Sequence, residues 1–141
     1  MRMDFYHQYA PFTKEFIRKI QEGQSLFFAF ENGLGANYLA QYAYYLASPL
    51  NWLFFFVPRD YVVEAMNISM VLRGGISGLA FFVYISKRHE RKTWFMVALS
   101  VCYALSAYYL AYSCNIMWMD CYALFPLVVM GVDEIVKGKS G

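Results

Sequence analysis

The chain has 141 residues, of which 60% are hydrophobic, 21% are aromatic and only 16% are charged, and its formal net charge is +2. Ordinary soluble domains are about 45–50% apolar and about 25% charged, so this composition is typical of a protein that lies within a lipid bilayer. The small net charge, with basic residues grouped in short connections between apolar runs, argues against nucleic-acid binding.

The first nine residues crowd titratable and hydrogen-bonding groups beside apolar sequence. Asp4 is followed by Tyr6, His7 and Gln8. We interpret Asp4 as a candidate general base and the three neighbours as groups that could hold substrate hydroxyls. The alternative is a solvated loop aspartate near a chain end. Because residues 1–23 lack the apolar run of a secretory signal, we expect a further membrane helix before residue 1.

Residues 11–22 are predicted to form an amphipathic helix, since Pro11 suits a first helical position and Gly23 suits a helix stop. This helix should lie flat on the membrane or cover the domain, although packing on protein outside this chain is an open alternative. Its apolar face would carry Phe12, Phe16, Ile17 and Ile20, and its polar face Lys14, Glu15, Arg18, Lys19 and Glu22.

Residues 38–57 contain no charge, yet their amides, serine and tyrosines make them a poor lipid-facing helix. Pro49 should divide the segment into two shorter helices, at about 37–47 and 50–57, because proline removes a backbone donor and clashes with the preceding turn. If this segment does not cross the membrane, Asp4 lies outside the cell; if it does cross, Asp4 is cytoplasmic.

Three later segments, 65–86, 94–113 and 117–136, each approach the ~20 residues that cross a ~30 Å hydrocarbon layer. The connection 87–92 carries four basic residues, which places it and the C-terminus in the cytoplasm by the positive-inside rule. Residues 1–64 are then external. We therefore predict an all-α polytopic membrane protein, a single domain over 1–141 with three transmembrane helices and external amphipathic helices that flank the membrane.

Arg73 lies about eight residues inside the first span, or ~12 Å deep at 1.5 Å per residue. A cation there costs at least ~2.5 kcal/mol unless it has a partner or a wet cavity. The nearby Gly74 and Gly78 have a spacing that lets another backbone approach. Arg73 is therefore expected to face protein or substrate, as a clamp for a phosphate group or as half of a structural ion pair.

Asp120 begins the outer part of the third span, where a charge must be solvated or paired. It could be the partner of Arg73, orient a substrate hydroxyl or bind a divalent cation, the only cofactor that these residues suggest. Asn115, in the same external segment, is a further candidate for substrate binding. Three tyrosines in the outer half of the second span form either an interfacial aromatic belt or a wall for sugar stacking: Tyr108, Tyr109 and Tyr112.

Six stretches, in the same order, carry a family likeness over nearly the whole chain. They are Asp4–Tyr9, Gly33–Asn37, Tyr44–Asn51, Gly75–Leu79, Tyr103–Ser106 and Asn115–Asp120. Together they resemble the N-terminal part of the bacterial YfhO family. The resemblance implies a multi-spanning glycosyltransferase of the GT-C architecture, which moves a sugar from a polyprenyl-phosphate donor to a cell-surface polymer such as lipoteichoic acid.

The resemblance also implies roles for single residues. In such enzymes the catalytic carboxylate follows the first span, and that role falls on Asp4. In the mechanism that we expect, Asp120 is the second acid and binds sugar hydroxyls or a metal ion. The position of Arg73 is often basic in the family, which favours the phosphate clamp. The family's first span and later helices have no counterpart here, so the chain alone is expected to be inactive. The alternative is a non-enzymatic membrane scaffold or transporter fragment, in which Arg73 and Asp120 form a structural pair.

Overall fold

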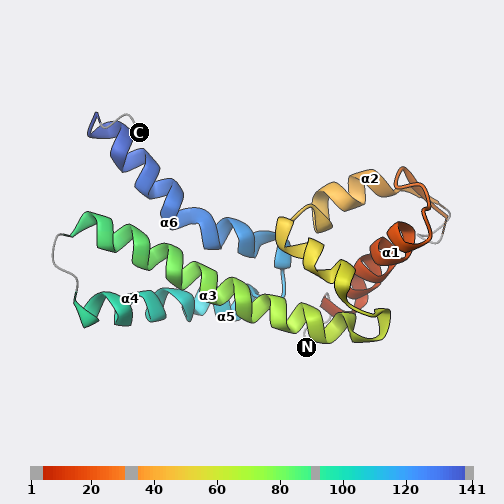
Figure 1. Ribbon diagram of the computed structural model, residues 1–141, viewed down its shortest axis with the longest axis horizontal. Coiled ribbons are helices and arrows are strands. Elements are labelled where there is room, and N and C mark those ends of the chain that lie inside the picture. Colours follow the sequence, from red (N-terminus) through yellow and green to blue (C-terminus); the bar gives the residue numbers. More distant parts are fainter. Residues whose placement is uncertain (1–4, 31–34, 90–92, 139–141) are drawn as a thin grey trace. The chain divides into compact units, whose positions relative to one another are not determined.

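The structure is a computed structural model of the chain, and it describes residues 5–30, 35–89 and 93–138. Helices make up nearly all of its regular structure, and three helical spans among the described residues are long and apolar enough to cross a membrane. The prediction of an all-α polytopic membrane protein is therefore confirmed. The chain divides into two compact units, residues 1–69 and 70–141 (Figure 1).

The first unit consists of short helices joined by tight turns. Pro49 opens η3, where Ser48 accepts a hydrogen bond from the Leu50 amide at 3.2 Å, so the predicted division of residues 37–57 into two helical parts is confirmed. The helices are η1 (Phe5–Tyr9), α1 (Ala10–Gln21), α2 (Tyr38–Gln41), η2 (Tyr42–Leu46), η3 (Pro49–Phe56) and η4 (Arg59–Tyr61).

A short antiparallel hairpin, β1 (Phe28–Ala29) and β2 (Ala36–Asn37), separates α1 from α2. Gly35 precedes β2 with a φ of +108°, and a Cβ there would lie 2.5 Å from the Phe28 ring. Only glycine satisfies both constraints. Asn37 then caps α2 by accepting a hydrogen bond from the Ala40 amide at 3.3 Å.

The core of this unit lies between α1, the hairpin and the α2–η2 segment. It contains the buried residues Phe16, Ala29, Tyr38 and Leu46. The apolar side of α1 therefore packs inward and covers the unit, which is one of the two arrangements that its amphipathic pattern predicted. The Tyr38 hydroxyl donates to the Phe12 carbonyl at 3.3 Å, and burial, with the nearby Glu15 carboxylate, raises the pKa of that hydroxyl above its ordinary value of about 10.

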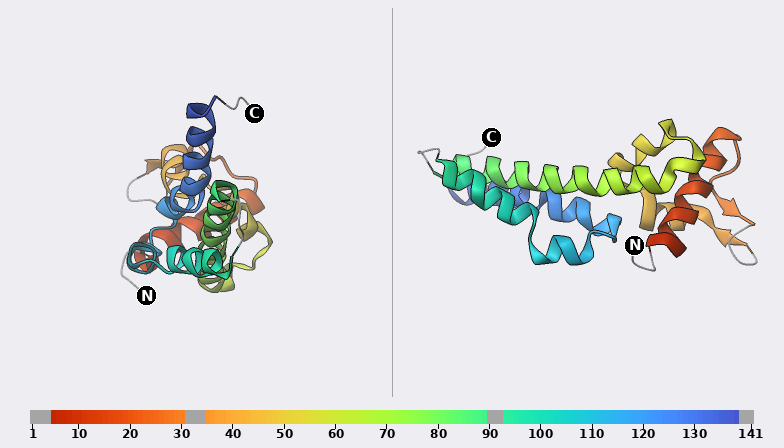
Figure 2. Two further views of the ribbon diagram at one scale, coloured as in Figure 1. Left: turned by 90° about the vertical axis from the view of Figure 1, so that its left-hand side faces the viewer. Right: turned by 90° about the horizontal axis from the view of Figure 1, so that it is seen from below.

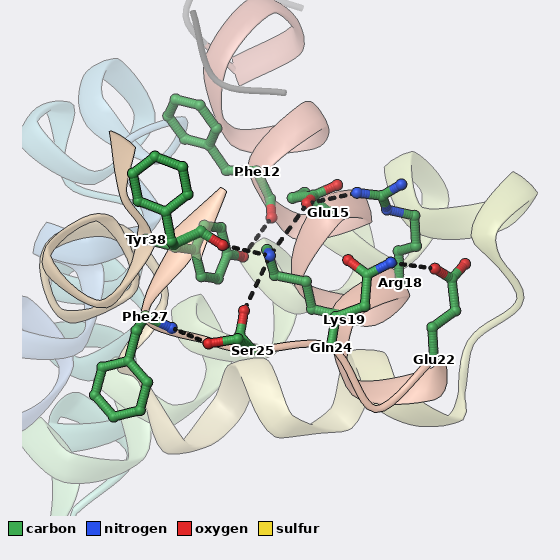
Figure 3. A network of polar contacts seen from close by, with 10 residues as sticks. Phe12, Glu15, Arg18, Lys19, Glu22, Gln24, Ser25, Phe27 and Tyr38 are labelled. Atoms are coloured by element: carbon green, nitrogen blue, oxygen red, sulfur yellow. Dashed lines mark hydrogen bonds and ion pairs between the residues drawn. The ribbon is translucent and has the colours of Figure 1, made fainter. Parts of the chain in front are cut away.

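The helical pattern predicted that Lys19 would lie on an exposed polar face, but the structure buries it. Its side chain is only 4% exposed, because the hairpin segment folds over this side of α1. The ammonium donates to the Ser25 carbonyl at 3.0 Å and to the Phe28 carbonyl at 2.8 Å (Figure 3). It also lies 3.8 Å from a Glu15 carboxylate oxygen and 5.2 Å from the centre of the Tyr38 ring.

The membrane-spanning helices follow. They are α3 (Val62–Arg88), which begins in the first unit, α4 (Trp94–Ala104), α5 (Ala107–Tyr112) and α6 (Ile116–Val136). The helix α3 is longer than the predicted span 65–86 at both ends. At Gly78, α3 and α4 approach closely, since a Cβ on this glycine would lie 3.1 Å from the Ala104 Cβ and 3.3 Å from the Ser100 carbonyl oxygen. One contact expected from the glycine spacing is thus present.

The second span, predicted as one helix over 94–113, is interrupted after Ala104 (Figure 2). Neither proline nor glycine occurs between residues 94 and 112, so side chains must satisfy the backbone at the break. The Tyr122 hydroxyl donates to the Tyr103 carbonyl at 2.5 Å, and the Ser106 hydroxyl accepts from the Tyr109 amide at 3.2 Å. These hydroxyls replace part of the lost helical hydrogen bonding within the bilayer.

Candidate functional site

The site of the second unit is an ion pair between two spans. Arg73 lies on α3 and Asp120 lies on α6, and the arginine Nε donates to the carboxylate Oδ1 at 2.8 Å. The arginine side chain is fully buried, whereas the aspartate side chain is 22% exposed. The structure thus joins the two charged residues that the sequence left as possible partners.

A buried arginine within a membrane span requires a partner for its charge. A cation within the hydrocarbon layer is costly when isolated, and an ion pair whose members are also hydrogen-bonded offsets that cost. Asp120 is the fifth residue of α6, which begins at Ile116, so its carboxylate also lies near the positive end of the helix dipole. Both effects offset part of the cost of burying the pair.

Tyr109 of α5 completes the surroundings of Arg73. Its hydroxyl donates to the Met70 carbonyl, one turn before Arg73 on α3. A Cβ at Gly74 would lie 3.1 Å from that hydroxyl and 3.2 Å from the ring, so the glycine provides the space that the tyrosine occupies. Gly75, by contrast, faces open space. The sequence pattern predicted a role for Tyr109 in an interfacial aromatic belt or in sugar stacking, and did not connect this tyrosine with Arg73.

A second group of ion pairs joins the other ends of the same helices. Lys87 bonds Glu134 at 3.2 Å, and Arg88 bonds Asp133 at 2.6 Å. Arg73 pairs with a residue near the start of α6, whereas Lys87 and Arg88, which come later in α3, pair with residues near its end, so the two helices run in the same direction. Fourteen residues separate Arg73 from Lys87, which corresponds to ~21 Å along the helix. The buried pair therefore lies far from the basic connection, toward the opposite membrane surface.

The remaining predicted site residues lie in two places. Asn115 is the residue before α6, so it lies one and a half helical turns from Asp120, on the same end of the span. Tyr6, His7 and Gln8 are exposed residues of η1 in the first unit, and the rings of Tyr6 and His7 meet edge to face at 5.6 Å. Asp4 lies outside the described residues.

The described part of the chain shows no cluster of side chains that could form a metal centre. Residues 5–30, 35–89 and 93–138 contain no group of three or more histidine, cysteine, aspartate or glutamate side chains arranged to hold an ion. The partly exposed carboxylate of Asp120, held by a buried guanidinium, can instead accept hydrogen bonds from hydroxyl groups.

These features define the class: a polytopic helical membrane protein with a buried ion pair that links two of its spans. Within that class, residues 1–140 match the family described as "Bacterial membrane protein YfhO". The chain therefore belongs to the YfhO family of bacterial membrane proteins, as its sequence predicted. No match was found among curated proteins or among solved structures.

Proposed function

We propose that this chain is part of a membrane glycosyltransferase that moves a sugar from a polyprenyl-phosphate donor to a cell-surface polymer, such as lipoteichoic acid, at the outer membrane face. Membership of a bacterial membrane protein family and the resemblance to GT-C enzymes support the proposal. The single structural observation that carries it is the Arg73–Asp120 pair, which holds a partly exposed acid and a cation within the span.

The reaction would use three charged residues. The Asp4 carboxylate takes the proton from the acceptor hydroxyl while the oxygen of that hydroxyl attacks the anomeric carbon of the sugar. The bond from the anomeric carbon to the lipid phosphate breaks in the same step. General-base help of this kind is worth about 10²–10⁴-fold in rate. The departing phosphate keeps the bonding electrons, and Arg73 stabilises the charge that develops on it. Asp120 accepts hydrogen bonds from sugar hydroxyls, or holds a divalent cation.

The burial of Arg73 refines its part in this mechanism. Its Nε is bonded to Asp120, so a donor phosphate competes with that carboxylate for the guanidinium. When the phosphate binds, Asp120 is released toward the sugar. This exchange couples the binding of the sugar donor to the release of the Asp120 carboxylate.

The proposal is tested by transfer in membranes that contain the full-length protein. Radiolabelled polyprenyl-phosphate hexoses are supplied one at a time, and the label that reaches the surface polymer is measured. Asp4→Asn should lower transfer by at least about 10²-fold while the amount of protein in the membrane is unchanged. Asp60→Asn, at an exposed position in the first unit, is the matched control and should retain transfer. Unchanged transfer by Asp4→Asn would remove this residue from the mechanism.

The second candidate is a non-catalytic scaffold or transporter fragment, and the complete burial of Arg73 against a direct carboxylate partner favours it. In that case the pair serves stability alone. Arg73→Gln and Asp120→Asn would each lower the folded yield, and the double variant would recover it together with full function. The transferase proposal predicts instead that the double variant folds and has lost transfer.

A further inference from the structure

A hollow of about 680 Å³ lies between the end of α3 and the start of α4, apart from the ion pair that the proposed function uses. Its volume falls within the range of about 300–1,000 Å³ that is usual for small-molecule sites. One side of it is polar and the other is apolar. The lining residues are Ile85, Arg88, His89, Thr93, Phe95, Met96 and Leu99.

The hollow lies at a membrane surface, because the chain leaves one span at Arg88 and enters the next at Trp94. Trp94 is 88% exposed, and tryptophan is enriched where spans meet the headgroup layer. This placement does not depend on which side of the membrane the connection occupies. Any ligand of the hollow is therefore in contact with the lipid layer.

The apolar wall continues along α4 into the span. Ile85 and Met96 are buried and form its inner part, whereas Phe95 and Leu99 are exposed toward the position of the lipid tails. An amphiphilic ligand can place its polar end beside Arg88 and Thr93 and its hydrocarbon along Phe95 and Leu99. A wholly polar ligand would leave this wall without a partner.

The charges around the hollow favour an anion. Arg88 is about half exposed, and although its Nη1 donates to Asp133 at 2.6 Å, a guanidinium has five donors in a fork that matches phosphate oxygens. Basic residues next to a span attract anionic lipids. Thr93, at the start of α4, makes no side-chain capping bond to the helix, so its hydroxyl adds a donor at this end.

We propose that this hollow is a binding site for one anionic phospholipid, with its phosphate between Arg88 and Thr93 and one acyl chain against Phe95 and Leu99. The site makes the end of α3 and the start of α4 selective for phosphatidylglycerol over zwitterionic lipids. It is independent of sugar transfer, and its test requires no enzymatic activity.

The test uses the full-length protein in phosphatidylcholine vesicles that contain either spin-labelled phosphatidylglycerol or spin-labelled phosphatidylcholine. The ratio of the two lipids immobilised by the protein gives the selectivity. Arg88→Gln should lower this ratio by about fivefold, as expected for one basic residue at a membrane surface. Lys137→Gln removes the same charge at the same end of the spans from a position outside the hollow, and should lower the ratio less than Arg88→Gln does, because it removes no contact with the bound lipid.

Two further variants separate a lipid site from a structural role of Arg88. Asp133→Asn frees the Arg88 guanidinium from its carboxylate partner and should raise the selectivity, whereas Arg88→Gln should lower it. If the pair were purely structural, both variants would change the selectivity in the same direction. Thr93→Trp places a large side chain in the hollow without changing any charge and should lower the selectivity. The proposal is overturned if Thr93→Trp retains it, or if Arg88→Gln and Lys137→Gln have equal effects, since general attraction to the basic surface would then explain the result.

Discussion

Among the residues that the structure describes, each unit contains one buried cation, and the two are stabilised in different ways. Lys19 of the first unit is bonded to two backbone carbonyls, with Glu15 3.8 Å away, so its charge is neutralised mainly by dipoles from its own neighbourhood in the chain. Arg73 of the second unit bonds a full carboxylate, Asp120, which is 47 residues away in sequence. The lysine fastens a hairpin to the helix next to it, whereas the arginine joins two membrane spans.

The difference reflects the surroundings of each unit. Two carbonyl groups, with a carboxylate 3.8 Å away, suffice for the lysine ammonium of the first unit, since the ammonium is a compact charge with three donors. Within the bilayer the desolvation cost is larger, and a carboxylate partner is needed to offset it. Loss of the contacts of Arg73 should therefore lower the free energy of unfolding more than loss of the contacts of Lys19.

The largest effect is expected when Asp120 is replaced by alanine, because the buried guanidinium then loses this carboxylate. Breaking a buried pair in this way costs about 3–5 kcal/mol. Unfolding of the purified protein in mixed detergent micelles, by titration with a denaturing detergent, measures the change. Glu134→Ala removes one member of an exposed pair on the same helix and should cost at most about 1 kcal/mol. Equal losses for the two variants would contradict the account of Arg73.

Lys19→Met should destabilise the first unit less, by about 1.5–3 kcal/mol, the usual contribution of hydrogen bonds from a charged group. Methionine has a similar length but no charge, so the loss reports on the two bonds to carbonyls together with the contacts of the ammonium with Glu15 and with the Tyr38 ring. Amide hydrogen exchange of residues 25–29 measures it. Faster exchange confined to this hairpin segment is expected, and protection as in the wild type would indicate that the ammonium contributes little.

Gly74→Ala tests the packing around Arg73 and should cost about 1–3 kcal/mol, because the added methyl group would lie 3.1 Å from the Tyr109 hydroxyl. Gly75→Ala is the matched control on the neighbouring residue, which faces open space. There the better helix propensity of alanine should leave stability unchanged or raise it by up to about 1 kcal/mol. The same detergent titration compares the two, and similar values for both would refute the close contact with Tyr109.

The smallest effect concerns pH. Because burial raises the pKa of Tyr38 in the folded protein, the unfolded chain loses this proton first as the pH rises above about 10. The stability that Tyr38 contributes is therefore complete below pH ~10 and decreases above it, by at most about 1.4 kcal/mol per pH unit. The free energy of unfolding, measured between about pH 9 and pH 11, should fall more steeply for the wild type than for Tyr38→Phe. Parallel curves would show that the hydroxyl does not titrate in this way.

Much of this architecture follows from the sequence. Apolar length predicts the three spans, and Pro49 predicts the division of the segment before them, because both depend on local chemistry. Arg73 and Asp120 stand out since charges are rare within such spans. Their pairing was one of several open possibilities, and it becomes definite only when α3 and α6 are placed side by side.

Other features depend on contacts that no local pattern contains. Lys19 occupies a polar position of an amphipathic helix, and the hairpin that covers it is marked in the sequence only by turn residues. The break after Ala104 lacks proline and glycine, and it depends on the Tyr122 hydroxyl from a different helix. Tyr109 is one of several tyrosines in its span, and only its contact with Gly74 distinguishes it.

The proposed function requires Asp4 and Asp120 to serve one site at the outer membrane face, and the sidedness of the two residues tests this proposal most directly. Single cysteines replace Asp4, Asn115 and Lys137 in full-length protein from which Cys102, Cys114 and Cys121 have been removed, and intact cells are treated with a membrane-impermeant maleimide. We predict labelling at positions 4 and 115 in intact cells, and at position 137 only after permeabilisation. Labelling of position 115 but not position 4 in intact cells would contradict the account, because the two acids would then lie on opposite sides of the membrane.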